Sequence, residues 1–426
     1  MENGRLGGLE CRECGRTYPI EPVHVCDFCF GPLDVTYDYA ALRQSLSREA
    51  IERGPLSLWR YWPLLPVERP TEDDGYRVGF TPLQRAHKLG EALGLRNLWI
   101  KNDSVNPSYS FKDRVVAVAI KKAREFGYET FACASTGNLA GAVAAAAARE
   151  GMSAYVFLPG DTEASKLVHA RSYGAHLISV NGSYDDVNRL CSELADTYQW
   201  AFCNINMRPY YSEGSKSLAF EVTEQLGWNL PDHVIAPVAS GSLVTKLHKG
   251  FGELQKVGLV AEGNVRISAA QADGCAPVSE AFLAGREAVR PVREPRTIAK
   301  SLAIGNPADG YYVIRIVKDT GGSMTISGDE DITAAIKLLA ETEGVFTETA
   351  GGVTISSLQQ LAASGVVRPD ECVVAYITGN GLKTLEAVES VARQPVYVDS
   401  TITSFETTLG LTPPSTPTSA EPALAE

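Results

Sequence analysis

The stretch of sequence that decides the fold is Asn106-Pro107-Ser108-Tyr109-Ser110-Phe111-Lys112-Asp113-Arg114. It follows a run with strand character at residues 98–101 and leads into a run with helical periodicity at 115–122. A lysine at such a junction can lie at the head of a cleft, where partial burial makes its amine a nucleophile near neutral pH. A solvated surface charge is the alternative for a lysine flanked by Asp and Arg. Other motifs must therefore decide the role of Lys112.

Three more motifs place small polar residues where a predicted strand ends. Ala134-Ser135-Thr136-Gly137-Asn138 offers hydroxyls, backbone N–H groups and a helix N-terminus to a carboxylate, although an ordinary N-cap would use the same residues. Pro237-Val238-Ala239-Ser240-Gly241-Ser242-Leu243 can cradle a phosphate by the same means. Thr378-Gly379-Asn380-Gly381-Leu382-Lys383 follows the apolar run 373–377, and a simple turn at the end of a strand is its alternative.

The order of the elements predicts a parallel α/β fold. Between residues 98 and 237, β-rich runs alternate with amphipathic or alanine-rich runs, as they do where helices cover a parallel sheet. The predicted strands are 98–101, 130–134, 154–158, 176–180 and 233–237, and the predicted helices are 115–126, 138–150, 164–173, 185–198 and 215–226. We also expect one helix over 39–53, a loop over 71–75, a helix led in by Pro82 and disorder from about residue 400, where Ser, Thr, Pro, Ala and Glu dominate.

Four of the nine cysteines lie together near the start, in Cys11-Arg12-Glu13-Cys14 and Cys26-Asp27-Phe28-Cys29. Four thiolates at this spacing suit tetrahedral Zn²⁺. The predicted ligands of a structural zinc are therefore Cys11, Cys14, Cys26 and Cys29. Disulfides and a ligand role for His24 are the alternatives, but nothing else in the sequence suggests an oxidising compartment. A zinc ribbon of about 35 residues would need its metal to fold.

The bulk properties of the chain favour an enzyme of the cytoplasm. The 426 residues carry a net charge of −12 without a Lys/Arg-rich block, which argues against nucleic acid or an anionic membrane as the main partner. A content of 44% hydrophobic and 21% charged residues is ordinary for a globular protein. No apolar run approaches the roughly 20 residues of a membrane span, and the N-terminus has no signal-peptide pattern.

Taken together, the motifs resemble those of the threonine synthases, which are fold-type-II pyridoxal-phosphate enzymes. Ser110-Phe111-Lys112-Asp113-Arg114 after Asn106-Pro107 resembles the cofactor-lysine motif of that family. Ile304-Gly305-Asn306-Pro307 and Glu213-Gly214-Ser215-Lys216-Ser217-Leu218-Ala219-Phe220-Glu221 resemble two further family segments. The resemblance covers residues 79–384 in a consistent order.

The resemblance implies a role for each motif. Lys112 would bind pyridoxal 5′-phosphate as a Schiff base and then transfer protons. Asn138 would bind the 3′-oxygen of the cofactor and Thr378 its ring nitrogen. The phosphate of the cofactor would be held by Ser240, Gly241, Ser242 and Leu243, and the α-carboxylate of the substrate by Ser135, Thr136 and Gly137.

The chain departs from the family pattern in four places. Tyr109 and Val115 stand where the family usually has glycine, and Ser-Gly-Ser replaces the more usual Gly-Asn-x-Gly-Asn in the phosphate loop. In place of Asn-Pro-x-Arg ahead of Glu213, the chain has Arg208, which is the only cation between residues 204 and 213. We predict that Arg208 binds the substrate phosphate. The alternatives are an arginine stacked on Tyr210 or Tyr211, or an anchor at Lys101, Arg171 or Lys216.

The implied activity is that of a carbon–oxygen lyase that converts the phosphorylated amino acid O-phospho-L-homoserine and water to L-threonine and phosphate. A β-replacement or β-elimination on a phosphoserine-like amino acid, as in the related cysteate synthases, is the first alternative, and a non-catalytic binding module is the second. The implied α/β architecture has a zinc-ribbon-like module (1–37), a large pyridoxal-phosphate-binding domain (38–110 and 216–395), a small α/β domain (111–215) and a disordered tail (396–426). The implied assembly is a homodimer.

Overall fold

The computed structural model describes residues 5–71, 77–135, 137–160, 164–182, 184–389 and 391–412. Its largest sheet has six strands in the order β12-β11-β10-β13-β5-β4. These strands are β4 (Leu83–Arg85), β5 (Leu98–Asn102), β10 (His233–Pro237), β11 (Arg266–Ala272), β12 (Met324–Ser327) and β13 (Val373–Ile377). All neighbours pair in parallel except β4, which runs antiparallel to β5.

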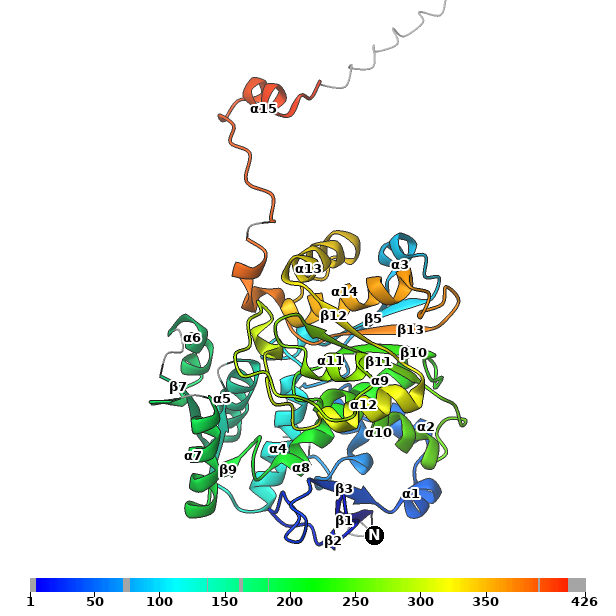
Figure 1. Ribbon diagram of the computed structural model, residues 1–426, viewed down its shortest axis with the longest axis vertical. Helices are drawn as coiled ribbons and strands as arrows, with labels where there is room; N and C mark the ends of the chain where they lie inside the picture. The colour runs from blue at the N-terminus through cyan, green and yellow to red at the C-terminus, as the bar shows by residue number, and fades with distance from the viewer. Residues whose placement is uncertain are drawn as a thin grey trace, which may run out of the picture.

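Helices cover both faces of this sheet because its strands are apolar on both sides. In β13, Val374 and Tyr376 belong to one apolar cluster, whereas Val373 and Ala375 belong to another on the opposite face. The first face is covered by α9 (Ser217–Gln225), α10 (Ser242–Lys256), α11 (Pro277–Leu283) and α12 (Gly310–Thr320). The second is covered by α3 (His87–Leu93), α13 (Asp329–Glu343) and α14 (Thr349–Ala363), which lie above the strands in Figure 1.

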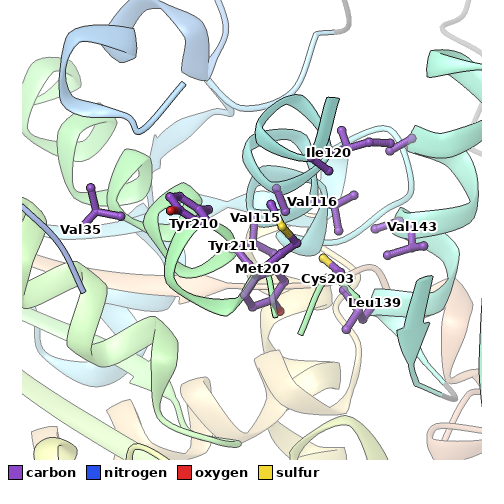
Figure 2. Close-up of a cluster of buried hydrophobic side chains, with 14 of the residues drawn as sticks. Val35, Val115, Val116, Ile120, Leu139, Val143, Cys203, Met207, Tyr210 and Tyr211 are labelled. Carbon is purple, nitrogen blue, oxygen red and sulfur yellow. The ribbon is translucent and has the colours of Figure 1, made fainter. Parts of the chain in front are cut away.

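A second sheet lies beside the first, at the left of Figure 1. Its four parallel strands, in the order β8-β7-β6-β9, are β6 (Thr130–Ala134), β7 (Ser153–Pro159), β8 (His176–Val180) and β9 (Ala201–Phe202). The accompanying helices are α4 (Lys112–Glu125), α5 (Asn138–Glu150), α6 (Ala164–Ser172), α7 (Tyr184–Thr197) and α8 (Arg208–Glu213). Figure 2 shows Val116 of α4, Val143 of α5 and Tyr211 of α8 in one apolar cluster, so these three helices are packed together.

The N-terminal module is a small antiparallel sheet that packs against this assembly. It consists of β1 (Leu6–Cys11), β2 (Thr17–Tyr18) and β3 (Leu33–Tyr37). Val35 of β3 shares the apolar cluster of Figure 2 with Tyr210 of α8. The Tyr37 hydroxyl donates a hydrogen bond of 2.8 Å to Glu213, which is the last residue of α8. The module is therefore joined to α8 by both apolar and polar contacts.

Much of the predicted secondary structure is confirmed. The strands at 130–134, 176–180 and 233–237 and the helix at 138–150 have the predicted bounds. Other predicted elements differ by one to three residues at an end, and α9 is preceded by a 3-10 turn, Gly214–Lys216. Side-chain periodicity is easiest to read in regular elements such as these.

Two expectations are wrong, and one helix begins three residues earlier than expected. Residues 39–53 form two helices, α1 (Tyr39–Ser45) and α2 (Arg48–Glu52), because Ser47 is extended and its hydroxyl accepts the Ala50 N–H as an N-cap. Pro82 leads into β4, which completes the edge of the sheet beside β5, and the helix begins only at His87. Helix α4 begins at Lys112 itself rather than at residue 115.

The C-terminal region contains a short helix where disorder was expected. Helix α15 (Ile402–Leu409) is capped by Thr401, whose hydroxyl accepts the Ser404 N–H at 3.1 Å. Residues 413–426 and most of the loop expected at 71–75 lie outside the described residues. Of the helices described, none has both the length and the apolar character that crossing a bilayer requires.

Candidate active site

Lys112 opens α4 with its amine directed toward α8. Its Nζ lies 3.0 Å from the Tyr211 hydroxyl and 4.6 Å from the centre of the Phe111 ring. Removal from water by these neighbours lowers the pKa of Lys112 to about 8. A substantial fraction of the amine is therefore neutral near physiological pH, as a nucleophile or proton acceptor requires.

The loop that ends at Lys112 is fastened to the loop that follows β13. The Phe111 N–H donates to the Thr378 carbonyl at 2.9 Å, and the Asn380 N–H donates to the Tyr109 carbonyl at 3.1 Å. Thr378 is buried. Two motifs that are far apart in the sequence therefore meet because β5 and β13 are parallel neighbours and both end at the same edge of the sheet.

Tyr109 has a left-handed backbone conformation. Its φ is +61°, which costs free energy for any residue except glycine. The Tyr109 N–H donates to the Asn106 carbonyl at 2.7 Å, which holds the turn in place. This conformation explains why glycine suits the position, while the ring of Tyr109 remains half-exposed.

Asn138, the first residue of α5, belongs to a polar cluster. Its Nδ2 donates to the Glu348 carboxylate at 2.9 Å, and Lys383 Nζ donates to its Oδ1 at 2.9 Å. Burial raises the pKa of Glu348 and lowers that of Lys383. On the loop ahead of α5, the Gly137 N–H donates to Ser135 Oγ at 3.2 Å, whereas Thr136 lies outside the described residues.

The predicted phosphate loop turns sharply between β10 and α10. Gly241 has a φ of +102°, and a Cβ at this position would lie 2.8 Å from Val313 Cγ2, so a side chain does not fit. The Ser242 hydroxyl is buried without a hydrogen-bond partner among the described residues. Leu243 packs into the apolar cluster beneath the loop. The hydroxyl and the N-terminus of α10 together form donors for an anion.

Arg208 is the first residue of α8, one helical turn before Tyr211. Its Nη2 pairs with Asp309 Oδ2 at 3.1 Å, and its side chain is 35% exposed. An ion pair with a buried aspartate was not among the roles expected for this arginine. Of the other candidate anchors, Lys101 and Lys216 lie in buried ion pairs of 2.7 Å with Glu221 and 2.6 Å with Glu213, so their charges are already compensated.

The four N-terminal cysteines converge. Their sulfur atoms all lie within 4.8 Å of one another, with Cys11 and Cys29 at 3.4 Å and Cys14 and Cys26 at 3.6 Å. All four are free thiols, which excludes the disulfide alternative in this structure. Four thiolates around Zn²⁺, with Zn–S bonds of about 2.3 Å, would be about 3.8 Å apart, so the donor set fits this metal.

The comparisons with known proteins identify the family. A family model described as "Pyridoxal-phosphate dependent enzyme" matches residues 76–379. The chain is 36% identical to the threonine synthase of Methanocaldococcus jannaschii over 391 residues, which cover 91% of this chain and 96% of that protein. The chain belongs to the threonine synthase family of pyridoxal-phosphate-dependent enzymes.

Further comparisons agree with this membership. The threonine synthase of Methanosarcina acetivorans is also 36% identical, over 92% of this chain and 96% of that protein. The structures of maize serine racemase and of a threonine deaminase from Solanum lycopersicum each have a TM-score of 0.61 and 22% identity over 73% of this chain, and cover 91% and 83% of their own chains. These likenesses confirm the fold class. A second family model, described as "NinF protein", matches residues 10–33 in the four-cysteine module.

The donors of this threonine synthase family member fit the cofactor of the family. The desolvated amine of Lys112 suits an aldehyde. The unpartnered hydroxyl of Ser242 and the side-chain-free turn at Gly241 suit a phosphate group. Both observations are independent of the family comparison.

Sequence reasoning missed three side chains of this region. Tyr211 and Asp309 lie beside recognised motifs, but a lone tyrosine or aspartate carries no signal of its own. Glu348 precedes a buried helix rich in small residues, and its carboxylate occupies the space that a Cβ at Gly379 would need. The glycine of the Thr378 motif was the one available signal, because a residue without a side chain indicates that another group lies close to it.

Proposed function

We propose that the protein is a threonine synthase that converts O-phospho-L-homoserine and water to L-threonine and phosphate. The observation that carries the proposal is the position of Lys112 opposite α8. Its amine, with a pKa of about 8, contacts Tyr211, and the same helix begins one turn earlier with Arg208. A proton acceptor and a cation for a phosphate thus come from one pair of packed helices, and the identity to named threonine synthases supports the same assignment.

Pyridoxal 5′-phosphate would be held by Lys112, with Asn138 and Thr378 at its ring. Its phosphate would be held by Ser240, Gly241, Ser242 and Leu243. Bound there, the cofactor supplies an electron sink that makes the C–H bonds near the amino group acidic. Glu348 and Lys383 would fix the amide of Asn138, because each contacts one end of it.

The protein's own groups would move protons and hold the substrate. The amine of Lys112 would take a proton from Cα and return it later in the reaction, a role for which a pKa near the working pH is best. Tyr211 would orient that amine through the 3.0 Å contact. The loop of Ser135, Thr136 and Gly137 would bind the α-carboxylate, and Arg208 would bind the phosphate that leaves.

The decisive experiment is an assay of phosphate release with identification of the amino-acid product. The purified protein, supplied with pyridoxal phosphate, should release phosphate from O-phosphohomoserine and form threonine. Turnover of phosphoserine with little or no turnover of O-phosphohomoserine would instead establish the cysteate-synthase-like alternative. If the protein showed no visible absorbance from a lysine-bound cofactor that borohydride removes, the binding-module alternative would be supported.

We further propose that the four cysteines bind a structural Zn²⁺. Metal analysis of protein purified without chelators should give one zinc per chain, and a clearly lower value would count against the proposal. A cytoplasmic location and a homodimeric assembly remain predictions from the sequence. Light scattering on the purified protein tests the second.

A further inference from the structure

Asp309 joins three separate parts of the molecule. Its carboxylate, only 5% exposed, accepts from Arg208 Nη2 on one oxygen and from Arg12 Nη1 on the other, both at 3.1 Å. Its backbone N–H donates to the Ser240 carbonyl in the phosphate loop at 2.8 Å. Arg12 belongs to the N-terminal module, and Arg208 opens α8. One buried carboxylate therefore connects the four-cysteine module with α8 and with the predicted phosphate loop.

Arg12 is held within the four-cysteine module. Arg12 directly follows Cys11, and its N–H donates to the Pro32 carbonyl at 3.0 Å. Its guanidinium packs over the Tyr312 ring at 5.0 Å and approaches Asp34 at 3.5 Å. The side chain is mostly buried, at 17% exposure, and so has little freedom to leave Asp309.

The module also holds the opposite end of α8. Glu213, the last residue of the helix, accepts from Tyr37 of β3 at 2.8 Å and from Lys246 at 2.6 Å. Lys246 in turn pairs with Asp34 of the same strand. Both ends of the helix that carries Arg208 are thus tied to the N-terminal module. Figure 1 shows the module beneath α8 and α10.

Two guanidinium groups share the Asp309 carboxylate, so it cannot neutralise both. Arg208 stays about one-third exposed, and within the described part of the chain its side chain has no hydrogen bond other than the one to Asp309. Its remaining N–H donors are available to an anion, while Asp309 fixes the plane of the fork. Because Arg12 already holds one oxygen of Asp309, the carboxylate loses less conformational entropy when it orients Arg208.

We propose that Asp309 is a positioning residue for the anion-binding arginine Arg208, and that Arg12 of the four-cysteine module holds Asp309 in place. The N-terminal module would then set the affinity of the candidate active site for a phosphorylated ligand, in addition to stabilising the fold. The proposal deepens the proposed function, because it rests on Arg208 as the phosphate anchor.

The test uses the protein loaded with pyridoxal phosphate, so that the cofactor's own phosphate site is filled. Inorganic phosphate binding is measured by calorimetry, and kcat and KM are measured with O-phosphohomoserine. Arg12→Gln should raise the Kd of phosphate and the KM about three- to tenfold, the range of one hydrogen bond's net contribution, while kcat changes less than about twofold. Arg12→Lys should recover part of the loss. Cofactor absorbance and metal content should stay unchanged.

Two further variants make the result specific. Arg16→Gln is the matched control, because Arg16 lies in the same module but pairs with the exposed Asp27 at 2.9 Å, and it should change neither constant. In an Asp309→Asn background, Arg12→Gln should add little, because it acts through Asp309. If Asp309→Asn does not fold, the comparison of Arg12→Gln, Arg12→Lys and Arg16→Gln still decides the question.

The proposal is overturned if Arg12→Gln behaves like Arg16→Gln, if kcat falls by the same factor as KM rises, or if the wild-type protein binds no phosphate. Failure of the proposed function is a different result. If O-phosphohomoserine is not turned over, but Arg12→Gln and Arg208→Ala both weaken phosphate binding, the positioning role stands and only the substrate assignment falls.

Discussion

Glu221 and Glu348 are both buried glutamates, but the charges around them differ. Glu221 accepts from Arg114 Nη1 at 2.5 Å and from Lys101 Nζ at 2.7 Å. Burial alone would raise its pKa, but these two cations outweigh burial and lower the pKa to about 2. The Glu348 carboxylate accepts from the neutral amide of Asn138 and forms no ion pair within the described part of the chain, so burial prevails and raises its pKa.

The difference separates a structural cluster from one that we propose to be functional. Around Glu221 each charge has a partner, and the cluster links β5, α4 and α9, so it stabilises the fold. Around Glu348 and Lys112 the charges are poorly compensated, a state that folding by itself does not favour. Ionisable groups with perturbed pKa values and without a compensating charge are found most often at functional sites.

The largest expected effect is on catalysis, from Lys112→Ala. Turnover should fall by at least the roughly 10²–10⁴-fold that a general acid–base group contributes. The melting temperature should not fall, because the desolvated amine gives up no ion pair. Lys101→Ala is the matched control, and should lower the melting temperature instead, since it leaves Glu221 without one cation. A rate loss below about tenfold in Lys112→Ala would contradict its assignment to the functional cluster.

Glu221→Gln tests the structural cluster. The substitution keeps the shape but leaves Arg114 and Lys101 with too little negative charge, and should lower the free energy of unfolding by about 3–5 kcal/mol. Chemical denaturation at pH 7 measures this change in the free energy of unfolding. Because the pKa of Glu221 is lowered, its stabilisation is present above about pH 4.5 and is lost as the pH falls toward 2, so wild type and variant should converge in acid. A constant difference down to pH 2 would argue against a charge effect.

Glu348→Gln is the same substitution in the functional cluster. We expect the free energy of unfolding to stay equal or to rise, because a carboxyl with a raised pKa is ionised at a cost when the protein is folded. We expect kcat to fall about tenfold, as for the loss of one hydrogen bond to a charged group, because the amide of Asn138 is oriented less well. If the free energy of unfolding fell as much as in Glu221→Gln, Glu348 would stabilise the fold in the same way as Glu221.

The smallest effect is a pH dependence of cofactor binding. The rate at which cofactor-free protein takes up pyridoxal phosphate should rise with pH through a midpoint near pH 8 and then level off, because the neutral amine of Lys112 is the reactive form. An unperturbed lysine would show a rise that continues to about pH 10. Absorbance-monitored uptake between pH 6 and 10 distinguishes the two.

The sequence by itself determined much of this protein. The alternation of β-rich and helical runs predicted the parallel architecture, because side-chain periodicity is a local property of the chain. The cysteine spacing predicted the convergence of four sulfur atoms, since short loops restrict where each thiol can lie. The motif around Lys112 predicted the family, which the comparisons confirm.

Only the tertiary structure decided which side chains meet. The two partners of Asp309, Arg12 and Arg208, are far from it in the sequence, as is Lys112 from Tyr211. Pairing with β5 also turned the segment after Pro82 into an edge strand. The physical reason is common to all these cases: burial, ion pairing and sheet closure depend on groups that are distant along the chain. The local side-chain pattern therefore determined most helices and strands, while long-range contacts determined which side chains meet in the candidate site.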